Sequence, residues 1–246
     1  MSPPGRKVRF YTSVATFLEE IVSSISHDDN GDFHDDDDDS PSILVIICST
    51  RDQFLEQLFI AVNNNDNNDN NDNGKDLLTR PIGLIAISST VKLIFCPTVE
   101  SFRAYISSSR LRQALSSQCQ QKKNQKEKQK EKKNQNDQQR PTLMILDPLG
   151  LHYLTPEFSA QGLSRTFASL VEAAARVGAE LILSESLDAV AFHGGGLSRH
   201  ALWYADVPLL SGSDAQGLGG DNNIGRGYGV PVKWIVQRWF DLDGGM

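Results

Sequence analysis

The residue best placed for chemistry in this chain is Asp147, an acid that ends an apolar run. The run Thr142-Leu-Met-Ile-Leu-Asp147 has the length of one buried strand. A helical pattern follows from Ala160, and Glu180–Ser184 again has the pattern of a buried strand. Strand, helix and strand in this order are typical of a parallel sheet, in which ligands gather at the carboxyl ends of the strands. Asp147 is therefore either a ligand-binding carboxylate or a structural hydrogen-bond acceptor.

Two loops beside these strands contain residues that suit nucleic acid. The first spans residues 148–158, and the second spans residues 187–200 and includes three consecutive glycines. Aromatic rings can stack on bases, and arginine can contact phosphate. Ordinary surface loops are the alternative interpretation. The candidate DNA-binding residues are His152, Tyr153, His193, Arg199 and His200.

Two tryptophans near the carboxyl terminus, Trp234 and Trp239, are candidates for a partner interface. Tryptophan and arginine are enriched in interfaces between proteins. Packing of both rings beneath neighbouring helices is the alternative.

The elements that must position these residues follow from apolar periodicity and capping residues. They predict one α/β domain with a mostly parallel, twisted sheet, helices on both faces and antiparallel strands at the carboxyl-terminal edge. Helices are expected over residues 13–26, 54–62, 102–115 and from 160 to a terminator at Gly178; strands are expected over 43–48, 82–87, 91–95, 142–146, 180–184, 201–210 and 230–240.

Three polar tracts interrupt this pattern, at residues 27–39, 63–75 and 117–140. They consist mainly of Asp, Asn, Gln and Lys, which cannot bury apolar surface, so we expect disordered inserts in a single domain spanning 1–246. Most of the net charge of −7 belongs to these tracts. The rest of the chain has no global basic field that would argue for nucleic acid, and no acidic field against it.

Cysteine usage and hydropathy limit the cellular setting. The chain has 3 cysteines without paired spacing, so neither a disulfide framework nor a zinc site is expected. No apolar run approaches the roughly 18 residues of a membrane span. These features predict a soluble, intracellular protein without a metal.

Three segments, in order, resemble the RecA-like recombinase family and especially its eukaryotic recombinase paralogues. Ile94–Arg103 is similar to the family's strand followed by Asp-Thr-Glu-Gly-Thr-Phe-Arg. Leu143–Asp147 is similar to its Walker B strand, and Ser159–Arg165 to the helix after its first DNA-binding loop. With Ile43–Val62 taken as the first strand and helix, the resemblance covers roughly residues 42–240.

The departures from this family concern its phosphate site. A P-loop needs glycines and a lysine that surround the phosphates, but Ile47–Gln53 contains neither. Arg51 stands about where the lysine belongs, and Asp52 about where the magnesium-binding hydroxyl belongs. Val99 takes the place of the catalytic carboxylate. The resemblance therefore implies a noncatalytic pseudo-ATPase, with Arg51, Asp52 and Asp147 as a degenerate nucleotide site and no cofactor.

Small ATPase-dead subunits of Shu-type complexes are the most similar members in size and in lost motifs. The resemblance implies a nuclear subunit of a homologous-recombination and DNA-repair accessory complex. Its expected partners are a paralogous RecA-like subunit, a recombinase, and single-stranded or branched DNA. Two alternatives remain open: a RecA-like scaffold subunit of the Elongator accessory subcomplex, which serves tRNA modification, and an ATP-dependent enzyme with an atypical phosphate site.

Overall fold

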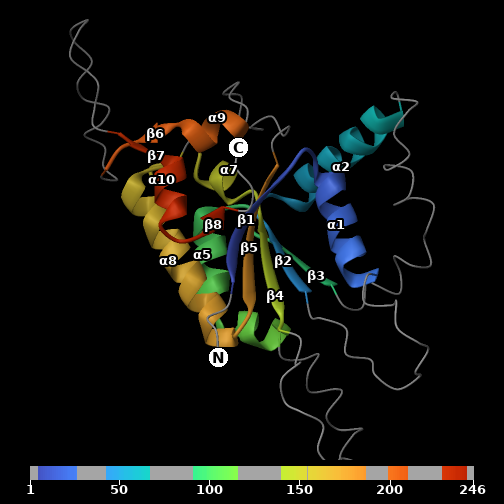
Figure 1. Ribbon diagram of the computed structural model, residues 1–246, viewed down its shortest axis with the longest axis horizontal. Coiled ribbons are helices and arrows are strands. Elements are labelled where there is room, and N and C mark those ends of the chain that lie inside the picture. Colours follow the sequence, from blue (N-terminus) through green and yellow to red (C-terminus); the bar gives the residue numbers. More distant parts are fainter. Residues whose placement is uncertain are drawn as a thin grey trace, which may run out of the picture.

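A sheet of six parallel strands forms the centre of the computed structural model, in the order β3-β2-β4-β5-β1-β8 (Figure 1). The structure describes residues 5–26, 43–66, 91–115, 140–153, 155–186, 199–209 and 229–242. Its main strands are β1 (Arg6–Tyr11), β2 (Ile43–Ile47), β3 (Val91–Phe95), β4 (Thr142–Leu146), β5 (Glu180–Ser186) and β8 (Asp241–Leu242). The α/β class and the mostly parallel sheet predicted from the sequence are confirmed.

Helices cover both faces of this sheet (Figure 1). The helices are α1 (Val14–Ser26), α2 (Arg51–Asp66), α5 (Val99–Ser107), α7 (Pro148–His152), α8 (Ala160–Val177), α9 (Arg199–Tyr204) and α10 (Val232–Gln237). Helices α1 and α2 pack on one face, and α5, α8 and α10 on the other. Expected helix 13–26 corresponds to α1, with Ser13 immediately before it.

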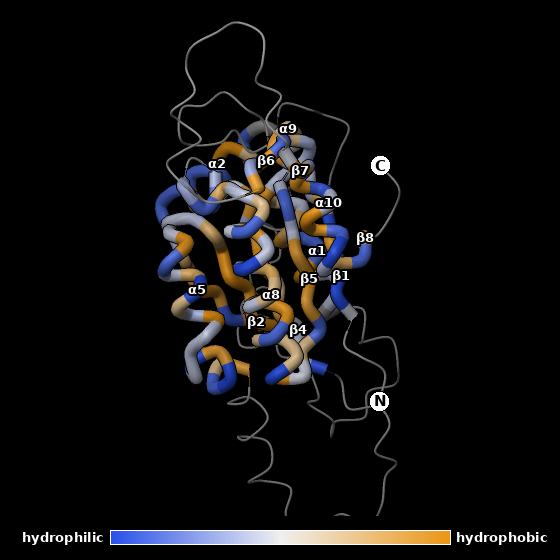
Figure 2. The backbone as a smooth tube through the Cα atoms, turned by 90° about the vertical axis from the view of Figure 1, so that its left-hand side faces the viewer, coloured by the Kyte–Doolittle hydropathy of each residue, from blue (hydrophilic) through white to orange (hydrophobic). Residues whose placement is uncertain are grey.

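The two faces of β2 explain why its sequence is apolar throughout. Leu44 and Ile46 belong to the core on the α5 and α8 side, whereas Val45 and Ile47 belong to the core on the α1 and α2 side. All five residues of the strand are buried. A parallel strand covered by helices on both faces loses the polar alternation of a half-exposed strand. Figure 2 shows the resulting concentration of hydrophobic residues along the strands in the middle of the fold.

Both ends of α8 are capped, and Gly178 ends the helix as predicted. The Ser159 side chain accepts a hydrogen bond from the Gly162 amide at 3.1 Å at the start of the helix. Gly178 ends the helix with φ 70°, a left-handed conformation that glycine adopts without steric cost.

The amino-terminal strand β1 was not predicted, although it lies inside the sheet between β5 and β8. It pairs in parallel with β5 along its whole length and with β8 at Lys7 and Val8. The sequence pattern did not indicate this strand, because Arg6, Lys7 and Arg9 interrupt the apolar pattern expected of a strand between two others.

The carboxyl-terminal strand predictions were wrong in detail. In place of the first predicted strand, the described residues 201–209 contain the end of α9 and the short strand β6 (Asp206–Val207). In place of the second, residues 230–237 form β7 (Val230–Pro231) and α10. The pair β6–β7 is antiparallel and forms a separate two-stranded sheet, while β8 completes the main sheet in parallel. Val232, Ile235 and Val236 are buried at helical spacing, but β-branched and aromatic residues favoured a strand interpretation.

The structure describes only a small part of the predicted inserts. Helix α2 extends through Asp66, so residues 63–66 belong to a helix and the predicted start of that insert was wrong. Residues 27–39, 67–75 and 117–139, and the predicted strand 82–87, lie outside the described residues. The expected helix 102–115 is interrupted at Ser108, where φ is −82° and ψ is 159°.

Candidate functional site at the carboxyl edge of the sheet

Asp147 links the ends of two neighbouring strands. It follows β4, is 3% exposed, and accepts a hydrogen bond at Oδ1 from the Ser186 amide at 2.8 Å. Its own amide donates to the Ser184 carbonyl at 2.8 Å. Its backbone is left-handed, with φ 60° and ψ 42°, a conformation in which Asp and Asn are enriched among residues other than glycine. The side chain thus acts as a structural acceptor between β4 and β5.

A second buried acid, Glu185, stabilises the start of α7. Its side chain is on β5, the residue is 3% exposed, and Oε1 accepts a hydrogen bond from the Leu149 amide at 2.9 Å. Sequence reasoning did not select this residue. An acid inside the run Glu180–Ser186 was the available signal, because a buried carboxylate requires a hydrogen-bond partner.

The turns that lead from three strands into helices are closed by their own side chains. In each turn, the residue before the helix accepts a hydrogen bond from an amide in the first turn, at 3.3, 3.2 and 3.1 Å respectively. The side chain at that first-turn position accepts one in return from the amide of the capping residue, at 3.1, 3.0 and 3.1 Å. The reciprocal pairs are Ser13 with Thr16, Thr50 with Gln53, and Thr98 with Ser101. These capping boxes occupy amides that a phosphate site would use.

The degenerate nucleotide site predicted from the resemblance is spread over two neighbouring strand ends. Arg51 and Asp52 are exposed in the first turn of α2, which follows β2, whereas Asp147 is buried after β4. Val99 is 3% exposed and belongs to the core beneath α5, where a carboxylate could not face solvent.

The residue assignment of that resemblance also needs one correction. Ile43–Val62 was taken as the first strand and helix, but β1 and α1 precede it in the chain. Their connecting residues, Thr12 and Ser13, contain no glycine and no lysine either. Both strand-to-helix turns that could be compared with a P-loop therefore lack its chemistry.

Arg103 is the centre of a polar network that sequence reasoning did not identify. From α5 it donates to the Thr166 hydroxyl at 2.9 Å, the Gly162 carbonyl at 2.8 Å and the Glu157 carboxylate at 2.8 Å. Arg165 adds a longer contact to Glu157 at 3.9 Å. The network joins α5 to the first turns of α8, and its side chains are widely separated in the sequence.

His152 belongs to the same network and does not reach the surface. It is 0% exposed; its Nδ1 is 2.9 Å from the Pro148 carbonyl, and its Nε2 is 2.9 Å from the Thr166 hydroxyl. Because a carbonyl only accepts, Nδ1 carries the hydrogen in the neutral ring, and Nε2 is left as an acceptor. The Thr166 hydroxyl hydrogen then lies between Nε2 and the Gly162 carbonyl, to which this hydroxyl also donates at 3.2 Å. Burial lowers the pKa of His152, which favours this neutral form. The prediction that His152 contacts DNA is therefore wrong for this conformation.

The structure describes the other predicted DNA-contacting residues to different extents. Tyr153 is half-buried and its ring meets Phe158 edge to face, with centroids 5.7 Å apart. The backbone of Arg199 and His200 begins α9, whereas their side chains and His193 lie outside the described part of the chain. The contact of these residues with DNA remains a prediction.

Trp234 is the more exposed of the two predicted interface tryptophans. It is 66% exposed on α10, while Trp239 is half-buried against the core. Tyr204 and Leu209 are 47% and 53% exposed, and Lys233 lies over the Tyr204 ring at 5.6 Å from its centroid. Helices α9 and α10 contact each other, which places Tyr204 and Trp234 on adjacent helices.

Burial raises the pKa values of two groups that lie at the ends of strands. Burial raises the pKa of Cys96 to about 11, so its thiol is not ionised at neutral pH. Burial, followed by the Glu20 carboxylate, raises the pKa of Tyr11 to about 12. Both groups are thereby held in their neutral forms, which are weak nucleophiles.

Within the described residues, no group of three or more His, Cys, Asp or Glu side chains could hold a metal ion. No helix in that part of the chain has the length and hydrophobicity needed to span a bilayer. Comparison with known proteins found no matching family model and no matching curated protein.

Proposed function

We propose that this protein is a noncatalytic RecA-like subunit of a nuclear homologous-recombination and DNA-repair accessory complex. In this role it assists recombinase loading through a paralogous partner and weak DNA binding. The observation that supports the absence of catalysis is the set of three capping boxes at the carboxyl edge of the sheet. They fill positions at which a nucleotide-binding relative would present free amides to phosphate.

The energetics of these turns argue against nucleotide binding. A phosphate would have to displace caps that each contribute about 1 kcal/mol to helix stability. Asp52 would repel the phosphate from an exposed position in the first turn of α2. Asp147 already accepts the Ser186 amide.

The surface around Trp234 supports a role in assembly. Trp234, Tyr204 and Leu209 each leave about half or more of their surface in solvent. Large exposed aromatic side chains are unfavourable in water, and they contribute strongly to the binding free energy when a partner buries them. We assign this surface to the paralogous subunit.

Weak DNA binding is assigned to the segment that precedes and begins α9. His193, Arg199 and His200 supply one permanent cation and two aromatic rings beside consecutive glycines. So few charges predict modest, salt-dependent affinity.

Affinity purification of the full chain from its native cells tests the proposal. Recombination factors should be recovered with the wild-type protein and lost with Trp234→Ala. Phe59→Ala is the matched control, because Phe59 is 68% exposed on α2, away from the α9 and α10 surface. Recovery of Elongator subunits in place of recombination factors would contradict the proposal.

A further inference from the structure

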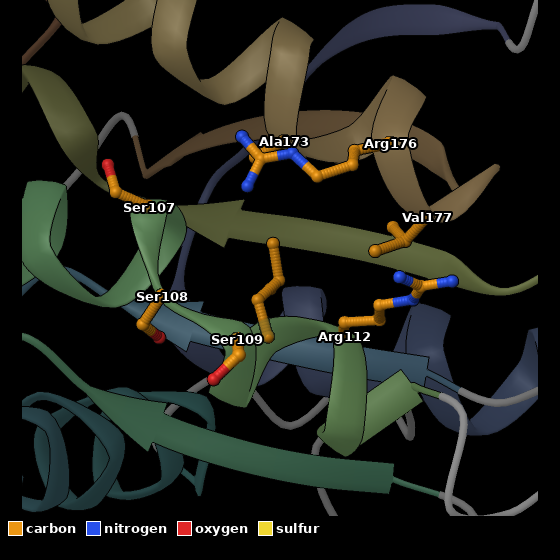
Figure 3. Close-up of a pocket in the computed structure, with 8 residues that line it drawn as sticks. Ser107, Ser108, Ser109, Arg112, Ala173, Arg176 and Val177 are labelled. Carbon is orange, nitrogen blue, oxygen red and sulfur yellow. The ribbon is translucent and has the colours of Figure 1, made fainter.

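A hollow of about 290 Å³ lies at the opposite end of the fold from Asp147. It opens where α5 ends, beside the helical residues 109–115 and the last turn of α8. Helix α5 starts after the carboxyl end of β3, and α8 leads into the amino end of β5, so both helices end near the amino edge of the sheet. The lining residues are Ser107, Ser108, Ser109, Leu111, Arg112, Ala173, Arg176 and Val177 (Figure 3).

The polar lining of this hollow consists of hydrogen-bond donors that suit an anion. Arg112 comes from the helical segment after Ser108, and Arg176 from the end of α8. Ser107 and Ser109 are exposed, while Ser108 donates its hydroxyl to the Tyr105 carbonyl at 2.7 Å. Guanidinium groups and hydroxyls together are the usual donors to phosphate oxygens.

The two arginines approach the hollow from different sides. Figure 3 shows the Arg176 side chain extending toward Ser107 and the Arg112 guanidinium lying near Val177. Arg112 is exposed, and the Arg176 side chain is 47% exposed, so both can change rotamer without disturbing the core. An anion in the hollow would draw both groups toward itself.

Three negative features compete with such an anion, namely the Glu172 carboxylate and the carboxyl ends of α5 and α8. Glu172 pairs with Arg176 at 3.2 Å, but its side chain is 74% exposed, so solvent screens the pair strongly. The carboxyl ends of α5 and α8 each contribute about half a negative charge. Glu172, Arg112 and Arg176 are all about half exposed or more, so solvent screens all three charges, and we expect an anion to bind weakly.

We propose that this hollow binds a phosphate monoester or inorganic phosphate dianion through Arg112 and Arg176. The apolar floor of Leu111, Ala173 and Val177 would contact the carbon atoms of a phosphorylated side chain. The site is separate from the strand ends that a RecA-like nucleotide would occupy, and its assignment does not depend on the proposed function.

The test is a calorimetric titration of the full chain at low ionic strength with two probes, inorganic phosphate and a short phosphoserine peptide. Wild-type protein should bind with millimolar affinity, and Arg112→Gln with Arg176→Gln should weaken binding at least about tenfold. Glu172→Gln removes the competing carboxylate and should tighten binding about two- to fivefold. Arg238→Gln is the matched control, because Arg238 is also exposed but does not line the hollow.

The two probes separate the two sources of phosphate. Tighter binding of the phosphoserine peptide identifies a phosphorylated partner side chain, and equal binding identifies free phosphate. Circular dichroism of each variant verifies that the fold is retained. The assignment is overturned if wild-type protein binds neither probe, or if the double variant and Arg238→Gln bind them equally well.

Discussion

Replacing Asp147 tests whether this acid holds the sheet together or serves a lost nucleotide site. Asp147→Ala removes the acceptor for the Ser186 amide, which is buried with it. An unpaired buried amide costs about 1–3 kcal/mol, and a left-handed alanine costs roughly 1–2 kcal/mol more. The expected loss is about 2–5 kcal/mol of unfolding free energy, measured by urea denaturation.

Asp147→Asn is the matched variant, because its side-chain carbonyl can accept the same hydrogen bond and asparagine tolerates the left-handed backbone. It should lose no more than about 1 kcal/mol. Magnesium and ATP should leave the melting temperature of the wild-type protein unchanged. Wild-type stability in Asp147→Ala would refute the structural role, and a melting temperature raised by magnesium and ATP would refute the reasoning about the phosphate site.

Three further predictions concern the first turn of α8, the buried histidine and the DNA segment. Gly162→Ala should destabilise the protein by about 1–3 kcal/mol in thermal unfolding, because a Cβ there would lie 2.2 Å from the Glu157 carbonyl oxygen; a stabilised variant would show that the turn relaxes freely. Burial lowers the pKa of His152 from its ordinary value of 6.5. On acidification the unfolded chain therefore takes up a proton at this residue at a higher pH than the folded protein does. The free energy of unfolding should be unaffected above pH 6.5 and should decrease as the pH falls from there through the folded-state pKa. Urea titrations should show this slope in wild-type protein and a flatter one in His152→Gln. Simultaneous alanine substitution of His193 and Arg199 should weaken single-stranded DNA binding and reduce the slope of log affinity against log salt by about 0.7; an unchanged slope would remove these residues from the interface.

Local sequence patterns were sufficient for the elements whose two faces are both apolar. Ile43–Ile47 and Thr142–Leu146 were predictable because buried parallel strands need continuous apolar runs. Helix α8 was predictable because its apolar residues recur at helical spacing and because Gly178 readily adopts the left-handed backbone that ends a helix.

The same local reasoning failed where distant contacts decide the structure. Strand β1 contains three basic residues, one of which, Arg9, pairs with Glu20 on α1. The exposure of His152 could not be predicted, because its partner Thr166 lies on a different helix. The network around Arg103 likewise depends on how α5 packs on α8.

The position of β1 has a consequence for synthesis of the chain. Residues 6–11 are translated before the strands on either side of them, which are residues 181–186 and 241–242. Until β5 has been synthesised, β1 therefore has no neighbouring strand with which to pair. Its backbone amides and carbonyls cannot form the hydrogen bonds of the sheet before then. The sheet can therefore close only after the ribosome has completed β5, and such long-range pairing is expected to slow folding.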